Sequence, residues 1–513
     1  MRDTNSNHPQ SKDLDISSYS TTTKLNHLKM STEIDEMEEG KAPPTIQKQK
    51  LLSDAQTFSP LDHENVLNKL LAEIKPIDFY EKADLLPGER LSKQNVVVIA
   101  IDSILDIAKK NNWGLTVIGE QVNIYNGAFW KTLDKNEIRH FLRQAVTQLG
   151  YDKLKGKYHQ FVEDLMKQFL VSSFVPKKAK ESNEILINFK NGTLVINETG
   201  QYLFKDFDAE DYLFYQLDFD FNPNVTTSLF DVFLNRVLID EADRMILAEF
   251  TGYVFIRNST LKLEKSLILY GNGANGKSTF FEILHALLGR ENVSNYSLQA
   301  LTNESGYQRA QIHNKLLNYA SDISSKMDSA VFKLLTSGEP VEARLPYGNP
   351  FIMENYARLI FNANELPRDV EQNTAFFRRF LILCFDQTIP ENERDPEMAK
   401  RIIATELPAI FNWVIHGMQR LIFQKGFTYS AKAEKAIEEY RKQSDSVAMF
   451  MYESDYTPGF SYKKPLKELY GDYRDYCNES GNRSVSNTKF SDRLRKLDFN
   501  VFRGTYGYMV EFK

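Results

Sequence analysis

The residues whose types and spacing best suit chemistry form a glycine-rich loop. Residues 267–270 are Leu-Ile-Leu-Tyr, and residues 271–278 match the pattern G-x-x-x-x-G-K-[ST] before an amphipathic stretch at 280–288. A loop of this kind between a strand and a helix is the context of a phosphate-binding P-loop, because its backbone amides and the helix N-terminus favour negative charge. We therefore expect ATP to be bound by Gly271, Asn272, Gly273, Ala274, Asn275, Gly276, Lys277, Ser278 and Thr279.

Binding of Mg²⁺ and catalysis require further residues. Lys277 would neutralise the β- and γ-phosphates, and the hydroxyl of Ser278 would ligate Mg²⁺. The next suitable strand, residues 315–320, is followed by Ser321 and Asp322. Asp322 is therefore the expected acidic residue that positions Mg²⁺ and water, while Asp328 is more readily explained as the cap of a helix.

Two further polar groups follow in the chain. The apolar run 358–363 ends at Asn364, whose amide could contact a γ-phosphate or the attacking water, although asparagine is also common in turns. Arg378 and Arg379 precede another apolar run. In a ring ATPase one of them would reach the neighbouring subunit's γ-phosphate, and a surface ion pair is the alternative.

Between these motifs lies an expected hairpin, with a turn at Tyr347-Gly348-Asn349. If the hairpin projects into a pore, Arg344 would contact phosphate and Tyr347 would stack on a base. Arg344, Tyr347 and Asn349 are thus candidate DNA contacts, and a purely structural hairpin is the alternative.

In this order, the motifs resemble those of the superfamily III helicases. More narrowly, they are similar to the helicase half of the phage/plasmid primase–helicase family, relatives of the poxvirus helicase-primase. Residues 188–193 and 250–253 also look like the region upstream of that family's motor. The resemblance covers roughly residues 110–513. It implies an AAA+ core, usually a hexamer, that hydrolyses ATP between subunits and moves 3′→5′ on single-stranded or forked DNA.

The resemblance also implies a C-terminal winged helix. Helices are expected at 466–477 and 486–497, and a wing at 499–512. Residues 461–513 contain eleven Lys/Arg and seven Asp/Glu, a local charge of +4 (11 − 7) against −6 for the chain. A recognition helix would carry its basic residues on or near the second of these helices, so the candidate DNA contacts are Lys489, Arg493 and Arg495.

The elements that must position these residues belong to an α/β fold. Apolar strand-like runs alternate with helical stretches between about 265 and 385. We expect four regions: a disordered polar arm at 1–60, an α+β region at 61–240, an AAA+ P-loop NTPase core at 241–440 and a winged-helix domain at 444–513.

Composition sets only broad limits. Of the 513 residues, 42% are apolar, which allows large cores, and the net charge of −6 argues against a basic surface over the whole molecule. The two cysteines, Cys384 and Cys477, cannot build a disulfide framework or a four-cysteine zinc site. The sequence shows no secretory signal or membrane span. These features indicate the reducing cytoplasm, here of a bacterial host cell.

Three hypotheses fit the motifs to different degrees. The favoured one is a replicative helicase of a phage, plasmid or other mobile element, with a separate primase or initiator because no primase domain is recognisable. A DNA-binding initiator ATPase would share every motif. A small-molecule kinase has no role for Asn364, the two arginines or the basic C-terminal region.

Overall fold

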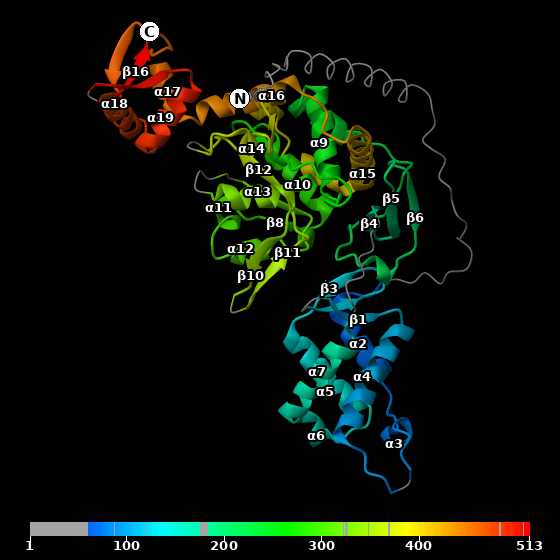
Figure 1. The fold of residues 1–513 in the computed structure, drawn as a ribbon. Coiled ribbons are helices and arrows are strands. Elements are labelled where there is room, and N and C mark those ends of the chain that lie inside the picture. Colours follow the sequence, from blue (N-terminus) through cyan, green and yellow to red (C-terminus); the bar gives the residue numbers. More distant parts are fainter. Residues whose placement is uncertain are drawn as a thin grey trace, which may run out of the picture. The chain divides into compact units, whose positions relative to one another are not determined.

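The computed structural model describes residues 60–513 except 87, 119–120, 175–182, 322, 324–326, 347, 368–369, 482–483 and 506. Residues 1–59 of the expected polar arm lie outside the described residues. Four hydrophobic clusters organise the remainder: one in an N-terminal part, two on the faces of a central sheet, and one in a C-terminal part (Figure 1).

The N-terminal part is a group of helices packed with a small antiparallel sheet. Val66, Leu70 and Ile74 repeat at helical spacing and are buried in its core. Asp134 is the N-cap of one helix, because its side chain accepts a hydrogen bond from the amide of Asn136 at 2.7 Å. The elements are α2 (His63–Glu73), α3 (Phe79–Lys82), α4 (Lys93–Lys110), β1 (Gly114–Ile118), β2 (Gln121–Tyr125), β3 (Trp130–Thr132), α5 (Lys135–Gln148), α6 (Lys153–Lys157) and α7 (His159–Ser172).

A three-stranded antiparallel sheet and two helices come next in the chain. The first two strands form a hairpin that turns at Asn191-Gly192, with Phe189 paired to Gly192. These elements share one hydrophobic cluster with the central sheet, so no boundary between cores falls at the expected residue 240; the change of core lies between 170 and 185. The elements are β4 (Ile185–Phe189), β5 (Gly192–Ile196), β6 (Tyr202–Lys205), the 3₁₀ helix η1 (Ala209–Asp211), α8 (Leu229–Val237) and α9 (Glu241–Tyr253).

The central sheet has five parallel strands in the order β13-β7-β12-β9-β8. The strands β7 and β13 are nearly continuous apolar runs, as expected where helices cover both faces of a parallel sheet. The strands are β7 (Ser266–Tyr270), β8 (Val293–Ser294), β9 (Leu317–Ala320), β12 (Arg358–Ala363) and β13 (Phe380–Cys384).

Alternate residues of these strands enter two different clusters. Leu267 and Leu269 of β7 belong to the cluster with α9, α10 and α15, and Ile268 belongs to the cluster with α11, α13, α14 and α16 (Figure 1). The covering elements are α10 (Lys277–Leu288), η2 (Arg290–Asn292), α11 (Leu298–Leu301), α12 (Tyr307–Ala310), α13 (Ser329–Ser337), α14 (Thr374–Phe377), η3 (Glu391–Glu393), α15 (Met398–Gln424) and α16 (Ala431–Gln443). A separate hairpin pairs β10 (Val341–Arg344) with β11 (Pro350–Met353), as predicted.

The C-terminal part has its own core. The two predicted helices and the terminal hairpin are present, together with a further helix and a strand that pairs with the hairpin. Its elements are α17 (Ser446–Glu453), β14 (Tyr462–Pro465), α18 (Leu466–Glu479), α19 (Asn487–Lys496), β15 (Asn500–Gly504) and β16 (Gly507–Phe512), with sheet order β14-β16-β15. In the part of the chain that the structure describes, no helix is long and apolar enough to cross a membrane.

Candidate nucleotide-binding site

The glycine-rich loop joins the end of β7 to the start of α10. Gly271 has φ +151° and Gly276 has φ +87°, and Ala274 between them also adopts a left-handed conformation, with φ +60°. A Cβ on Gly271 would lie 2.5 Å from the carbonyl oxygen of Phe385. The loop is therefore wound closely against the segment that follows β13, and glycine is required where the backbone turns.

Lys277 is folded back over this loop. Its Nζ donates to the carbonyl oxygens of Gly271 at 2.6 Å and Asn272 at 2.9 Å, and to Oδ1 of Asn275 at 3.0 Å. Asn275 is held in turn because its Nδ2 donates to the carbonyl of Phe385 at 2.8 Å. Burial lowers the pKa of Lys277. An anion in the loop would offer this buried ammonium group a charged acceptor in place of the neutral ones.

A cavity of about 460 Å³ opens beside the loop at the carboxyl end of the sheet. Besides the loop it reaches Ser278 and Thr279, the predicted Asn364, and several residues that motif analysis did not indicate. The lining residues are Gly273, Ala274, Asn275, Gly276, Lys277, Ser278, Thr279, Asn362, Asn364, Ile389, Arg394, Asp395 and Pro396. The volume suits a small-molecule ligand.

The residues missed by sequence analysis reach the cavity in two ways. Asn362 lies two positions before Asn364 on β12, so the two-residue period of a strand was a usable signal. Residues 389–396 approach through a tertiary contact, because the amide of Ile389 donates to the carbonyl of Ala274 at 2.8 Å. No local sequence pattern predicts that contact.

The predicted acidic residue, Asp322, lies outside the described residues. The strand before it, β9, ends at Ala320, next to Phe361 of β12. Strand β12 separates β9 from β7 and so stands between Asp322's strand and the glycine-rich loop. Within the described ranges no three His, Cys, Asp or Glu side chains gather as a metal site.

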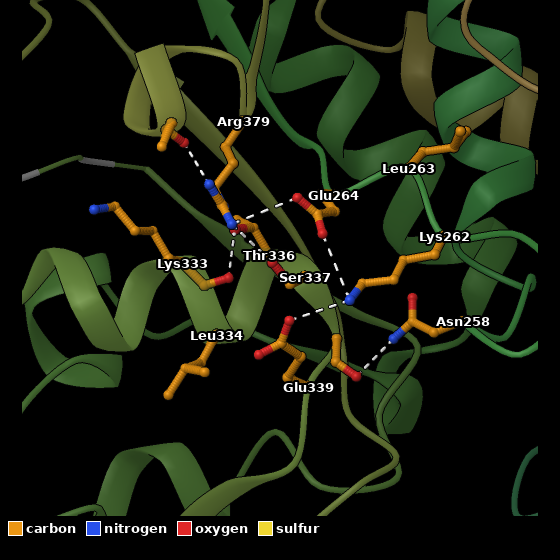
Figure 2. A network of polar contacts seen from close by, with 12 residues as sticks. Asn258, Lys262, Leu263, Glu264, Lys333, Leu334, Thr336, Ser337, Glu339 and Arg379 are labelled. Atoms are coloured by element: carbon orange, nitrogen blue, oxygen red, sulfur yellow. Dashed lines mark hydrogen bonds and ion pairs between the residues drawn. The ribbon is translucent and has the colours of Figure 1, made fainter. Parts of the chain in front are cut away.

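The two arginines before β13 have different surroundings, and Figure 2 shows those of Arg379. Arg379 is buried, its Nη2 donates to Oγ of Ser337 at 3.0 Å, and its Nη1 donates to the carbonyl of Ala375. Arg378 keeps 58% of its side chain exposed and pairs with Glu264 at 2.8 Å. Arg379 is therefore engaged within its own chain, and the geometry favours Arg378 for any contact with a neighbouring subunit.

Glu264 is the centre of this polar network. Its Oε2 also lies 3.5 Å from Nη2 of Arg379, and its Oε1 lies 3.5 Å from Nζ of Lys262. Lys262 in turn reaches Oε1 of Glu339 at 3.1 Å (Figure 2). The network links the segment before β7 to the end of α13 and to the start of β13.

The hairpin residues are placed at an exposed tip. Arg344 is exposed at the end of β10, and its Nε donates to the carbonyl of Gly348 at 2.9 Å. Asn349 is also exposed, and the predicted Tyr347 lies outside the described residues. The tip thus presents Arg344 and Asn349 to solvent.

The basic residues of α19 do not share one environment. Lys489 is exposed, and Arg495 is paired with Asp492 at 3.2 Å on the surface. Arg493 is mostly buried, with 13% of its side chain exposed, and its Nη1 lies 2.9 Å from Oδ1 of Asp445, which caps α17. Arg493 therefore holds α19 against α17, and Lys489 and Arg495 are the accessible cations of the three.

Family comparisons match two parts of the chain. Residues 106–239 match the family described as "D5 N terminal like". Residues 269–379, which run from β7 through the glycine-rich loop to Arg379, match a family of unknown function, DUF5906. Each match covers less than half of the chain.

Individual relatives are distant. A protein of Acanthamoeba polyphaga mimivirus named "Putative helicase L207/L206" is 23% identical over 241 residues, which cover 43% of this chain and 24% of that protein. The chain therefore spans about a quarter of that relative's length. An A-form apo structure of the NrS-1 C-terminal region is 13% identical with a TM-score of 0.43, over 78% of this chain and 87% of that one. Another apo structure of this region is 12% identical with a TM-score of 0.42, over 80% of this chain and 97% of that one. TM-scores this low do not establish a common fold.

Proposed function

We propose that the chain is an ATP-dependent DNA helicase of a phage, plasmid or other mobile element, built on an AAA+ P-loop NTPase core of the superfamily III type. The observation that carries this proposal is the buried ammonium group of Lys277, which is held by neutral acceptors of the glycine-rich loop beside the cavity. The match to a D5 N-terminal-like family and the helicase-named viral relative support it.

The loop residues suit the phosphates of ATP. Lys277 would exchange its loop acceptors for β- and γ-phosphate oxygens, and the amides at the start of α10 would face the same charge. Ser278 and Asp322 would hold Mg²⁺, which neutralises the charge that develops on the transferred phosphoryl group. Asn364, at the end of β12, would orient the attacking water.

DNA contacts are proposed at two exposed places. The hairpin tip would offer Arg344 and Asn349 to the backbone and Tyr347 to a base. The C-terminal part, which we propose is a winged helix, would use Lys489 and Arg495 of α19, with Arg493 supporting that helix from within. Single-stranded and forked DNA are the proposed substrates.

The experiment that tests this function combines hydrolysis with strand displacement. We expect single-stranded DNA to stimulate ATP hydrolysis by the wild-type protein, and a forked duplex to be opened only with ATP and Mg²⁺. If hydrolysis occurs but DNA neither stimulates it nor is displaced, the alternative of an initiator ATPase without processive unwinding is the better account. Whether the protein proves to be a helicase or an initiator ATPase, a separate primase would be sought as a partner.

Substitutions of the two arginines are expected to have different effects: loss of Arg378 should lower ATP turnover, and loss of Arg379 should lower stability. Arg378→Ala removes only an exposed ion pair, so the free energy of unfolding should change by less than about 1 kcal/mol. If Arg378 reaches the next subunit's γ-phosphate, ATP turnover should fall by roughly 10³-fold. Arg379→Ala removes a buried cation from its partners and should lower the free energy of unfolding by about 2–4 kcal/mol. Urea unfolding and ATP turnover measure the two effects.

Mixing two inactive variants tests whether Arg378 acts in a homo-oligomer, which we propose is a hexamer. Lys277→Ala subunits keep Arg378, and Arg378→Ala subunits keep Lys277. An equimolar mixture should therefore regain part of the ATP turnover if the arginine acts between subunits. A mixture as inactive as its components, at a protein concentration where the wild type is assembled, contradicts the role of Arg378 in a neighbour's site.

A further inference from the structure

Asn362 has an unusual environment on β12. Asn362 is one of the residues that line the cavity beside the glycine-rich loop, and its Oδ1 is buried with no hydrogen-bond partner among the residues that the structure describes. Buried polar atoms are nearly always paired, because an unpaired acceptor loses its hydrogen bonds to water without replacement. An unpaired acceptor on a residue that lines a ligand cavity can be paired by a donor that arrives with the ligand.

The position of Asn362 narrows the identity of that partner. On the neighbouring strand β7, Leu269 is paired with Asn362 and Tyr270 with Ala363, so Asn362 lies close to where the glycine-rich loop begins. Ser278 and Thr279 line the same cavity. An amide oxygen is an acceptor, so it cannot bind a phosphate oxygen directly and requires a donor. Waters bound to Mg²⁺ are suitable donors, because Mg²⁺ usually keeps several of its waters when it binds with nucleotide phosphates.

We propose that Asn362 is a positioning residue for the metal of the proposed ATP hydrolysis, and that its Oδ1 accepts a hydrogen bond from a water molecule coordinated to Mg²⁺. Asn364, which we assigned to the attacking water, and Asn362 then have separate tasks on one strand. This inference rests on the proposed function, because it requires a Mg²⁺–nucleotide complex in the cavity.

The test compares Asn362→Leu with the wild type at varied Mg²⁺ concentration. Outer-shell partners of a metal typically contribute 10- to 100-fold to metal affinity or activity. We therefore expect the Mg²⁺ concentration for half-maximal ATP turnover to rise by about 10- to 100-fold, while the melting temperature of the nucleotide-free protein stays the same or rises because an unpaired polar atom is removed. Asn362→Asp keeps an acceptor at the same position and should retain most of the wild-type Mg²⁺ dependence.

Tyr319→Phe is the matched control. The hydroxyl of Tyr319 on β9 is also buried without a hydrogen-bond partner in the described part of the chain. The ring of Tyr319 stacks on that of Phe281, with 3.9 Å between the ring centroids, and Tyr319 is not one of the residues that line the cavity. Removing this hydroxyl should leave turnover and Mg²⁺ dependence unchanged.

Three results would overturn the proposal. The first is unchanged Mg²⁺ dependence in a folded Asn362→Leu protein. The second is an equal loss in Asn362→Asp, because the acceptor would then not matter. The third is a lower melting temperature with activity lost only in proportion to unfolded protein, which would make the amide structural. If wild-type protein hydrolyses no ATP, the proposed function itself fails; if wild type is active and only Lys277→Ala is inactive, this inference alone fails.

Discussion

Lys277→Ala is expected to lower ATP turnover by about 100-fold or more while leaving the protein folded. The ammonium group would make charge-assisted hydrogen bonds to phosphate oxygens, each contributing roughly 1.5–3 kcal/mol. Since about 1.4 kcal/mol corresponds to a tenfold change in rate, two such bonds account for the expected loss. In the free protein the same group bonds to Gly271, Asn272 and Asn275. Lys277 and Asn275 themselves line the cavity, so water can replace part of the lost ammonium group and the cost in stability should be small.

Turnover, nucleotide affinity and the urea midpoint should be measured on the same preparations. Lys400→Ala is a suitable control, because Lys400 is an exposed lysine at the start of α15 that pairs only with Glu397 on the surface. It should behave as wild type in all three measurements. Near-normal turnover in Lys277→Ala would remove the main support for the proposed motor.

Gly276→Ala is expected to damage both the loop and the packing behind it. Gly276 has φ +87°, where an L side chain is strained, and an added Cβ would lie 2.5 Å from Cγ1 of Val237 and 3.1 Å from Cε2 of Phe233. Strain in the backbone costs roughly 1–2 kcal/mol and overpacking roughly 1–3 kcal/mol, so the free energy of unfolding should fall by about 2–5 kcal/mol. The displaced loop should also lose nucleotide affinity.

Gly273→Ala is the matched substitution in the same loop. Gly273 is not among the glycines with positive φ, and no atom lies within 4 Å of an added Cβ. Its free energy of unfolding should change by less than about 0.5 kcal/mol. Urea unfolding and binding of a fluorescent ADP analogue would compare the two variants. Equal unfolding midpoints for Gly276→Ala and Gly273→Ala would show that α8 does not constrain the loop.

Some features of this protein were accessible from local sequence patterns. The glycine-rich loop follows a strand and precedes a helix, as residues 267–288 predicted, because apolar runs and helical periodicity are local properties. The hairpin before and after residues 345–349 was predicted for the same reason. Asn364 was expected at the end of a strand and lies directly after β12, where it lines the cavity.

Other features depended on which distant segments meet. Arg378 and Arg379 are adjacent and equivalent as sequence, and Glu264, 114 residues before Arg378, contacts both of them. The buried arginine, Arg379, is distinguished by its contact with Ser337, 42 residues before it. Arg493 was expected to face DNA, but its partner Asp445 lies 48 residues away and holds it within the fold. Ion pairs and cavity walls of this kind are formed by tertiary packing, and the spacing of residues along the chain does not encode them.

The environment of Asn362 likewise depends on tertiary packing. In the sequence it is one polar residue of an apolar run, two positions before Asn364, and this spacing is its only local signal. Its significance comes from two facts of the folded state: the parallel pairing of β12 with β7 beside the loop, and the absence of a partner for its buried oxygen among the described residues. Sequence alone therefore determined which loop we propose as the phosphate-binding loop, and the tertiary structure decided which side chains surround it.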